Sequence, residues 1–181
     1  MGEGGFAVSG DADWIERVRC LSNFGIDPGD FKVHQAGSNA KLSEYHAAVG
    51  IAALARWPER AALRSALATE YRQCLEAKCD GIRFQQRPVG GAYAAFCVLL
   101  PASTDPNLVG SRLSAVGIET RRWYYPPLNG HPAFADSAVA GKLAATTRIS
   151  SSLLGLPFHL DLNPVGIDRI ARELAQILGD T

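Results

Sequence analysis

The chain has 181 residues, enough for one ordinary domain or two small ones, and a chain of this size needs no disulfide or metal ion to support its core. Hydrophobic residues make up 47% and charged residues 20%, which is typical of a globular protein and argues against intrinsic disorder. Eighteen basic residues balance eighteen acidic ones, so we expect neither a nucleic acid nor a membrane surface as a partner.

The amino-terminal part is expected to hold a short strand, a helix, a loop and a second helix. Alternating apolar residues predict the strand over residues 5–9, and Asp11 or Asp13 can cap the helix that follows. Residues 25–40 are rich in glycine, proline, aspartate and asparagine, which indicates a loop. Apolar residues at helical spacing then predict a helix over residues 41–56.

Pro58 lacks an amide donor and must kink or restart this helix, which then runs to about residue 78. One side of the restarted helix is apolar. Four arginines fall outside that side and indicate a solvated face: Arg56, Arg60, Arg64 and Arg72.

The pattern changes after residue 80 to short strands between helices. Strands are predicted over residues 82–86, 93–100, 118–125 and 150–154, the first two joined by a Pro-Val-Gly-Gly turn. Helices are predicted from Asp105 to Gly117, over 133–144, and from Asn163 to just before Gly179. The sequence therefore predicts residues 80–181 to be a small α+β domain with a mixed or antiparallel sheet covered by helices, with residues 58–79 as a linking helix.

The four cysteines, Cys20, Cys74, Cys79 and Cys97, match neither a zinc signature nor a redox pair. We therefore expect reduced thiols and no metal. The sequence shows no basic and apolar secretory leader and no run of 18 apolar residues. Together these features predict a cytoplasmic protein.

Gly37, Ser38 and Asn39 lie just before a predicted helix, where backbone amides and a polar side chain can meet an anion such as phosphate. The alternative is that Ser38 or Asn39 only caps the helix. For an isolated triplet, the cap is the more common of the two.

A second candidate is the segment from Arg121 to Leu128, which holds two arginines and three aromatic residues. These side chains could bind a phosphorylated or ring-bearing ligand through charge and stacking. The alternative is an edge strand whose aromatic residues pack inward. His131 and His159 each follow a loop and are more simply structural. Taken alone, these residues name no reaction.

Several motifs taken together resemble the DegT/DnrJ/EryC1/StrS family of sugar aminotransferases. They are Gly-Glu-Gly-Gly at 2–5, Arg-Cys-Leu-Ser-Asn-Phe-Gly at 19–25, Gly-Ser-Asn-Ala-Lys-Leu-Ser-Glu at 37–44, Gly-Ile-Glu-Thr-Arg-Arg at 117–122, Tyr-Pro-Pro-Leu at 125–128 and Leu-Gly-Leu-Pro-Phe-His at 154–159. Each string is weak alone, but their order and their gaps match the family over the whole chain.

The resemblance implies the carboxy-terminal portion of a fold-type-I transferase that uses pyridoxal phosphate. Such enzymes move an amino group from glutamate to the keto carbon of a nucleotide-linked sugar, and their active sites are shared across a homodimer. Residues 1–57 would then be a remnant of the large cofactor domain.

The family's Schiff-base lysine lies a few residues before Gly-Glu-Gly-Gly, where this chain has only Met1. The resemblance therefore implies that the lysine lies upstream, that the chain holds no catalytic residue, and that the chain is inactive alone. None of the four lysines, Lys32, Lys41, Lys78 and Lys142, is expected to replace it. The alternatives are a half-enzyme complemented by a lysine-bearing chain and a non-catalytic sugar-nucleotide-binding or dimerisation module.

By the same resemblance, Asn39, with Ser38 and Gly37, would reach the cofactor phosphate of a neighbouring subunit. Arg121, Tyr124 and Tyr125 match the region that lines the nucleotide-sugar pocket, and Lys41 is expected on the substrate side. Asn129 stands where relatives often have histidine. A severed half should also expose the apolar faces of the 11–24 and 41–56 helices, from which we expect either self-association or an open apolar patch.

Overall fold

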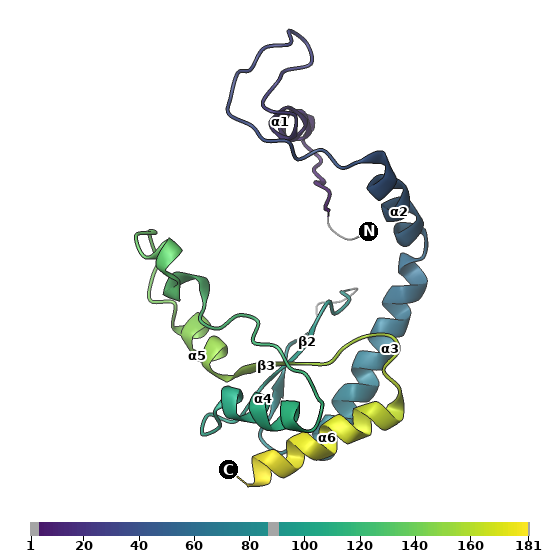
Figure 1. The fold of residues 1–181 in the computed structure, drawn as a ribbon, viewed down its shortest axis with the longest axis vertical. Helices are drawn as coiled ribbons and strands as arrows, with labels where there is room; N and C mark the ends of the chain where they lie inside the picture. Colours follow the sequence, from purple (N-terminus) through teal and green to yellow (C-terminus); the bar gives the residue numbers. More distant parts are fainter. Residues whose placement is uncertain (1–3, 87–90, 181) are drawn as a thin grey trace. The chain divides into compact units, whose positions relative to one another are not determined.

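The computed structural model describes residues 4–86 and 91–180. The chain forms two compact units, Met1–Pro58 and Glu59–Thr181. Figure 1 traces the elements along the chain, and each unit is described by itself. The Pro-Val-Gly-Gly turn predicted for positions 88–91 falls largely outside the described residues.

The first unit contains two helices, α1 (Ala12–Ser22) and α2 (Glu44–Ala55). Asp11 caps α1 as predicted, because its carboxylate accepts hydrogen bonds from the amides of Asp13 and Trp14. The strand predicted for residues 5–9 is wrong. A strand exists only through hydrogen bonds to a neighbouring strand, and these residues pair with no described segment.

Few side chains of the first unit are buried. Among its described residues only Cys20 and Gly25 are buried, and α2 buries none. Apolar side chains of α2 stand open, including Tyr45 (85% exposed) and Ile51 (70% exposed). An apolar helix of this kind is normally buried. The expected open apolar surface on these helices is therefore confirmed.

The second unit is built on a three-stranded antiparallel sheet in the order β1-β2-β3. The strands are β1 (Arg83–Phe84), β2 (Phe96–Leu99) and β3 (Leu153–Leu156). In the register of β2 and β3, Phe96 faces Leu156 and Leu99 faces Leu153. The predicted small antiparallel sheet is confirmed.

Three helices, α3 (Trp57–Glu76), α4 (Pro106–Ala115) and α6 (Pro164–Gly179), carry the apolar side chains that pack with this sheet. Asp105 and Asn163 cap α4 and α6, so both helices start where the sequence predicts. The core residues with at most 1% exposure are Tyr71, Leu75, Val98, Val109, Leu113, Leu154, Ile167, Ala171 and Leu174.

Two predictions in the middle of the second unit are wrong. Residues 118–125 form no strand and make a single bridge, between Arg121 and Gly155. The helix predicted over 133–144 is replaced by two short 3-10 turns, η1 (Leu128–Gly130) and η2 (Pro132–Phe134).

The helix of this region is α5 (Ala144–Ser152). Its last residues, 150–152, were predicted to begin the strand over residues 150–154. Three consecutive serines end α5, and their hydroxyls donate back to the carbonyls of Thr147 and Arg148. These local bonds satisfy helix carbonyls near the end of α5. Strand β3 therefore begins only at Leu153.

All four cysteines carry free thiols. Burial raises the pKa of the Cys79 thiol from 9.0 to about 11, so this thiol is neutral at ordinary pH. Among the described residues, no helix has both the length and the apolar character needed to span a bilayer.

Candidate functional site

The Gly37-Ser38-Asn39 triplet lies in a pair of antiparallel segments, residues 21–26 and 33–41, which we call the loop ribbon. Asn23 and Asn39 face each other across it, and Ile26 faces Val33. The Phe24 amide donates to the Ser38 carbonyl at 3.0 Å, and the Ala40 amide donates to the Ser22 carbonyl at 2.9 Å. The backbone on both sides of Asn39 is thereby held in place.

Two glycines allow the segments of the loop ribbon to cross. A Cβ at Gly37 would lie 2.2 Å from the Gly25 nitrogen and 2.6 Å from the Leu21 carbonyl oxygen. A Cβ at Gly25, whose φ is +79°, would lie 1.8 Å from the Gln35 carbonyl oxygen. Since all these atoms belong to the backbone, no side chain can move aside to make room.

The structure removes the alternative that Ser38 or Asn39 caps a helix. Helix α2 begins at Glu44, and its cap is Ser43, whose hydroxyl accepts from the His46 amide. The Ser38 amide also donates to the Leu21 carbonyl and is not free to meet an anion. An anion would therefore be met by the Asn39 side chain, which is exposed and makes no hydrogen bond within the described part of the chain.

Lys41 lies in the loop ribbon beside Asn39. Its ammonium donates to the Asn23 side-chain oxygen at 2.7 Å. It also lies 4.5 Å from the centre of the Phe24 ring, a cation–π distance. Phe24 has a φ of +61°, an unfavourable conformation for a bulky residue, and the Lys41 contact helps to hold it there.

The second candidate site lies in the second unit, where the two neighbouring arginines differ. The side chain of Arg121 is 70% exposed and forms an ion pair with the Glu119 carboxylate at 3.9 Å. Arg122 instead points inward. It donates to the Asn107 side-chain oxygen at 2.6 Å and to the Ser150 carbonyl at 2.8 Å, and its guanidinium lies 4.4 Å from the centre of the Tyr125 ring.

Arg122→Met is expected to lower the free energy of unfolding by about 2 kcal/mol, because two charge-assisted hydrogen bonds are lost and their acceptors are left without a donor. Urea unfolding checks this value. Arg121→Met, the matched control, should change it by less than about 0.5 kcal/mol, because that side chain is exposed. Equal losses for the two variants would contradict this assignment.

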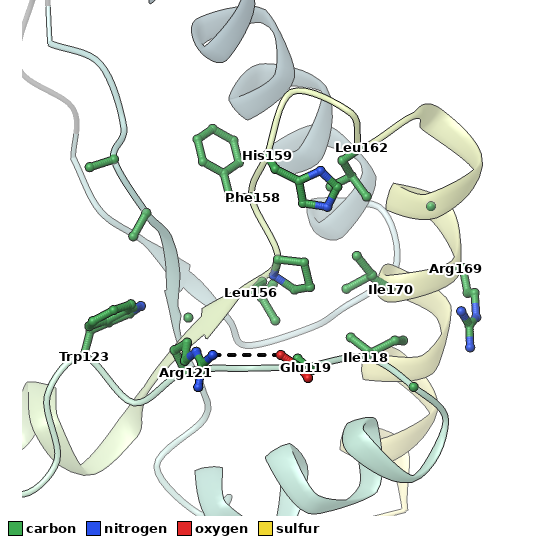
Figure 2. A pocket seen from close by; sticks show the side chains of 16 residues that line it. Ile118, Glu119, Arg121, Trp123, Leu156, Phe158, His159, Leu162, Arg169 and Ile170 are labelled. Atoms are coloured by element: carbon green, nitrogen blue, oxygen red, sulfur yellow. Dashed lines mark ion pairs between the residues drawn. The ribbon is translucent and has the colours of Figure 1, made fainter. Parts of the chain in front are cut away.

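A cavity of about 530 Å³ opens beside Arg121. Figure 2 shows Glu119 and Arg121 as an ion pair at one wall, with Trp123 near them and His159 on the segment after β3. His159, which the sequence suggested was structural, lines this cavity with an exposed side chain. Only its place in three dimensions reveals this, because a lone histidine after a loop carries no sequence signal.

The three residues of this segment that were expected to line the nucleotide-sugar pocket, Arg121, Tyr124 and Tyr125, do not line one common cavity. Tyr124 lines a separate, mostly apolar cavity of about 630 Å³, with Leu128, Asn129 and Phe134 among its other lining residues. Tyr125 lines neither of these two cavities. Trp123 lines both, because its indole lies against Gly155, where a Cβ would be 2.7 Å from the ring.

Two arginines of α3 that were expected to be solvated make specific contacts instead. Arg64 donates to the carbonyls of Tyr93 and Ala94 at 2.7 and 2.8 Å, and lies 4.7 Å from the centre of the Phe158 ring. Arg72 lies 4.7 Å from the centre of the Phe84 ring. The solvated-face prediction is therefore wrong for Arg64, whose guanidinium stacks on a ring from elsewhere in the chain, whereas the Arg72 side chain remains 40% exposed.

Comparisons with known proteins agree on one family. The model of the DegT/DnrJ/EryC1/StrS aminotransferase family matches residues 1–175. The chain is 32% identical over 168 residues to dTDP-3-amino-3,4,6-trideoxy-alpha-D-glucose transaminase of Streptomyces venezuelae, covering 89% of this chain and 42% of that protein. It is 28% identical over 183 residues to GDP-perosamine synthase of Caulobacter vibrioides, and this match covers 98% of this chain and 48% of that protein.

Solved structures show the same fold. The Streptomyces venezuelae protein DesV, solved with a ketimine intermediate, superimposes with a TM-score of 0.79 at 29% identity, covering 94% of this chain and 46% of that one. A PLP-dependent aminotransferase of Bacillus cereus gives a TM-score of 0.82 at 24% identity, which shows the fold alone. The chain spans about half the length of the relatives that it matches.

Proposed function

Because the chain belongs to the DegT/DnrJ/EryC1/StrS aminotransferase family, we propose that it is the carboxy-terminal part of a nucleotide-sugar aminotransferase. The whole enzyme would transfer an amino group from glutamate to a keto-sugar nucleotide with pyridoxal phosphate, in the cytoplasm. The names of the relatives support this class of reaction. Residues 1–57 would belong to the cofactor domain, residues 58–79 would form the linking helix and residues 80–181 would form the smaller domain.

The observation that carries the proposal is the exposed side chain of Asn39, held on a rigid ribbon without a partner in the described part of the chain. An amide NH₂ group is a suitable donor to a phosphate oxygen. Asn39 is the residue that we assign to the cofactor phosphate of a neighbouring subunit, with Ser38 beside it. Gly37 acts by letting the ribbon close.

Pyridoxal phosphate supplies the electron sink for amino transfer, and this chain supplies binding groups. From the resemblance to the family, we assign covalent attachment of the cofactor to a lysine in the amino-terminal half of the enzyme. The exposed apolar face of α2 supports assembly with that half or with a second copy.

On the substrate side, we assign Arg121, Tyr124 and Tyr125 to the nucleotide-linked sugar. The Arg121 guanidinium is open to solvent and can bind a diphosphate. The exposed fractions of the two tyrosines are 65% and 52%, so each ring can contact a sugar or a base.

The experiment is a spectroscopic titration of the chain with pyridoxal phosphate. Alone, it should give no absorbance band that borohydride reduces and no labelled lysine by mass spectrometry. With an amino-terminal half of a relative that carries the attaching lysine, the band should form and glutamate should be deaminated. A strong band from this chain alone that maps to one of its lysines would overturn the half-enzyme proposal.

A further inference from the structure

Three polar side chains share one face of the loop ribbon. Residues directly opposite in an antiparallel pair project to the same face with Cβ atoms about 5 Å apart, which places Asn23 beside Asn39. Lys41 is two residues beyond Asn39, and alternate residues of an extended segment share a face. The 2.7 Å hydrogen bond from the Lys41 ammonium to the Asn23 side-chain oxygen is consistent with this arrangement.

The hydrogen bond between Lys41 and Asn23 leaves this face rich in donors. It occupies the oxygen of Asn23, so the NH₂ group of Asn23 remains, and the Lys41 ammonium keeps two of its three hydrogens. The Asn39 NH₂ group is also without a partner among the described residues. The face therefore offers an ammonium and two amide NH₂ groups.

Two acidic residues lie between the two segments of the loop ribbon, and the carboxylates of both accept hydrogen bonds from local backbone amides. Asp27 accepts from the Gly29 amide at 2.7 Å. Asp30 accepts from the Lys32 amide and contacts the His34 ring, and these contacts lower the pKa of its carboxyl below the usual value. No carboxylate within the described part of the chain forms an ion pair with Lys41. The charge of Lys41 is thus available to an external anion.

We propose that Asn23 and Lys41 join Asn39 in a single binding site for a phosphate group. This rests on the proposed function, in which Asn39 contacts a phosphate, and it adds Asn23 while moving Lys41 from the sugar to the phosphate. The dianion has three peripheral oxygens for the three donor groups. Two sources share this chemistry, the 5′-phosphate of the cofactor and the diphosphate of the sugar nucleotide.

The site is preorganised by the backbone. The contact between Gly25 and Gly37 and the hydrogen bonds on both sides of Asn39 hold the two asparagines in register. The contact of the Lys41 ammonium with the Phe24 ring, at 4.5 Å from its centre, further restricts this side chain. Little conformational entropy is then lost when a phosphate binds.

The test measures binding of pyridoxamine 5′-phosphate and of UDP by ³¹P NMR titration of the chain, with phosphate-free pyridoxamine as the control ligand. Asn23→Asp is the central variant: its carboxylate keeps the contact with Lys41 but repels the phosphate. We expect about tenfold or greater weakening for Asn23→Asp, Lys41→Met and Asn39→Ala. Lys41→Arg should bind within about threefold of the unsubstituted chain, because the charge remains.

Lys32→Met is the matched control, since Lys32 is an exposed lysine of the same unit that pairs with Asp30, and it should bind like the unsubstituted chain. Circular dichroism and the melting temperature confirm folding of each variant, and Asn23→Asp keeps the test valid if Lys41→Met unfolds. The tighter of the two phosphate ligands identifies the source.

Loss of binding in Asn39→Ala alone, with Asn23→Asp and Lys41→Met unchanged, would overturn the three-residue site and leave the role of Asn39 intact. Unchanged binding in all three variants, or no binding by the unsubstituted chain, would overturn both this inference and the phosphate contact of the proposed function.

Discussion

Leu113→Ala is expected to lower the free energy of unfolding of the second unit by about 3 kcal/mol. Leu113 lies on α4 and is fully buried in the core that α4 forms with the sheet and α6. The substitution removes three carbon atoms from contacts on every side and leaves a cavity, and both effects favour unfolding. Urea unfolding followed by circular dichroism measures the change.

The matched control is Leu108→Ala on the same helix. Leu108 is 49% exposed, so the same chemical change should cost less than about 1 kcal/mol. A loss for Leu113→Ala no greater than that for Leu108→Ala would show that α4 does not pack as described.

Gly37→Ala is expected to open the loop ribbon, at a cost of about 2 kcal/mol or more. The new Cβ would lie 2.2 Å from the Gly25 nitrogen and 2.7 Å from the Phe24 carbonyl carbon, so the two segments must separate. The Ser38 and Ala40 amides, which now donate across the loop ribbon, would then exchange with solvent. Hydrogen exchange resolved at these amides is the measurement, and phosphate binding at Asn39 should weaken in parallel.

Gly10→Ala is the control, because a Cβ at Gly10 would meet no atom within 4 Å. In the Gly10→Ala variant, the hydrogen-exchange rates of the loop-ribbon amides should match those of the unsubstituted chain. Unchanged protection of Ser38 and Ala40 in Gly37→Ala would contradict the close crossing of the two glycines.

The sequence pattern identified Gly37, Ser38 and Asn39 as candidate site residues, but it did not predict how the backbone around them is arranged. The sequence predicts the triplet at 37–39 to lie just before a helix that begins at residue 41, yet α2 begins at Glu44 and the triplet lies in an antiparallel pairing. The arrangement depends on a contact between backbones twelve residues apart, at Gly25 and Gly37. Neither glycine reveals its partner in the sequence.

The sequence by itself determined two kinds of feature: those that depend on neighbouring residues, such as helix starts, and those that depend on many motifs added together, such as family membership. Asp11, Asp105 and Asn163 placed the starts of α1, α4 and α6, because a cap acts on amides within three residues. The motifs, summed over the chain, indicated the family that the family model confirms.

Only the tertiary structure decided which polar side chains bind other parts of the chain and which remain exposed. Arg122 is bound to Asn107 and Ser150, while Arg121 is exposed. Lys41 contacts Asn23 across the loop ribbon. Arginine and lysine reach partners that other segments bring to them, so their roles depend on distances in space. No spacing along the chain encodes those distances, because they are set by how the elements pack.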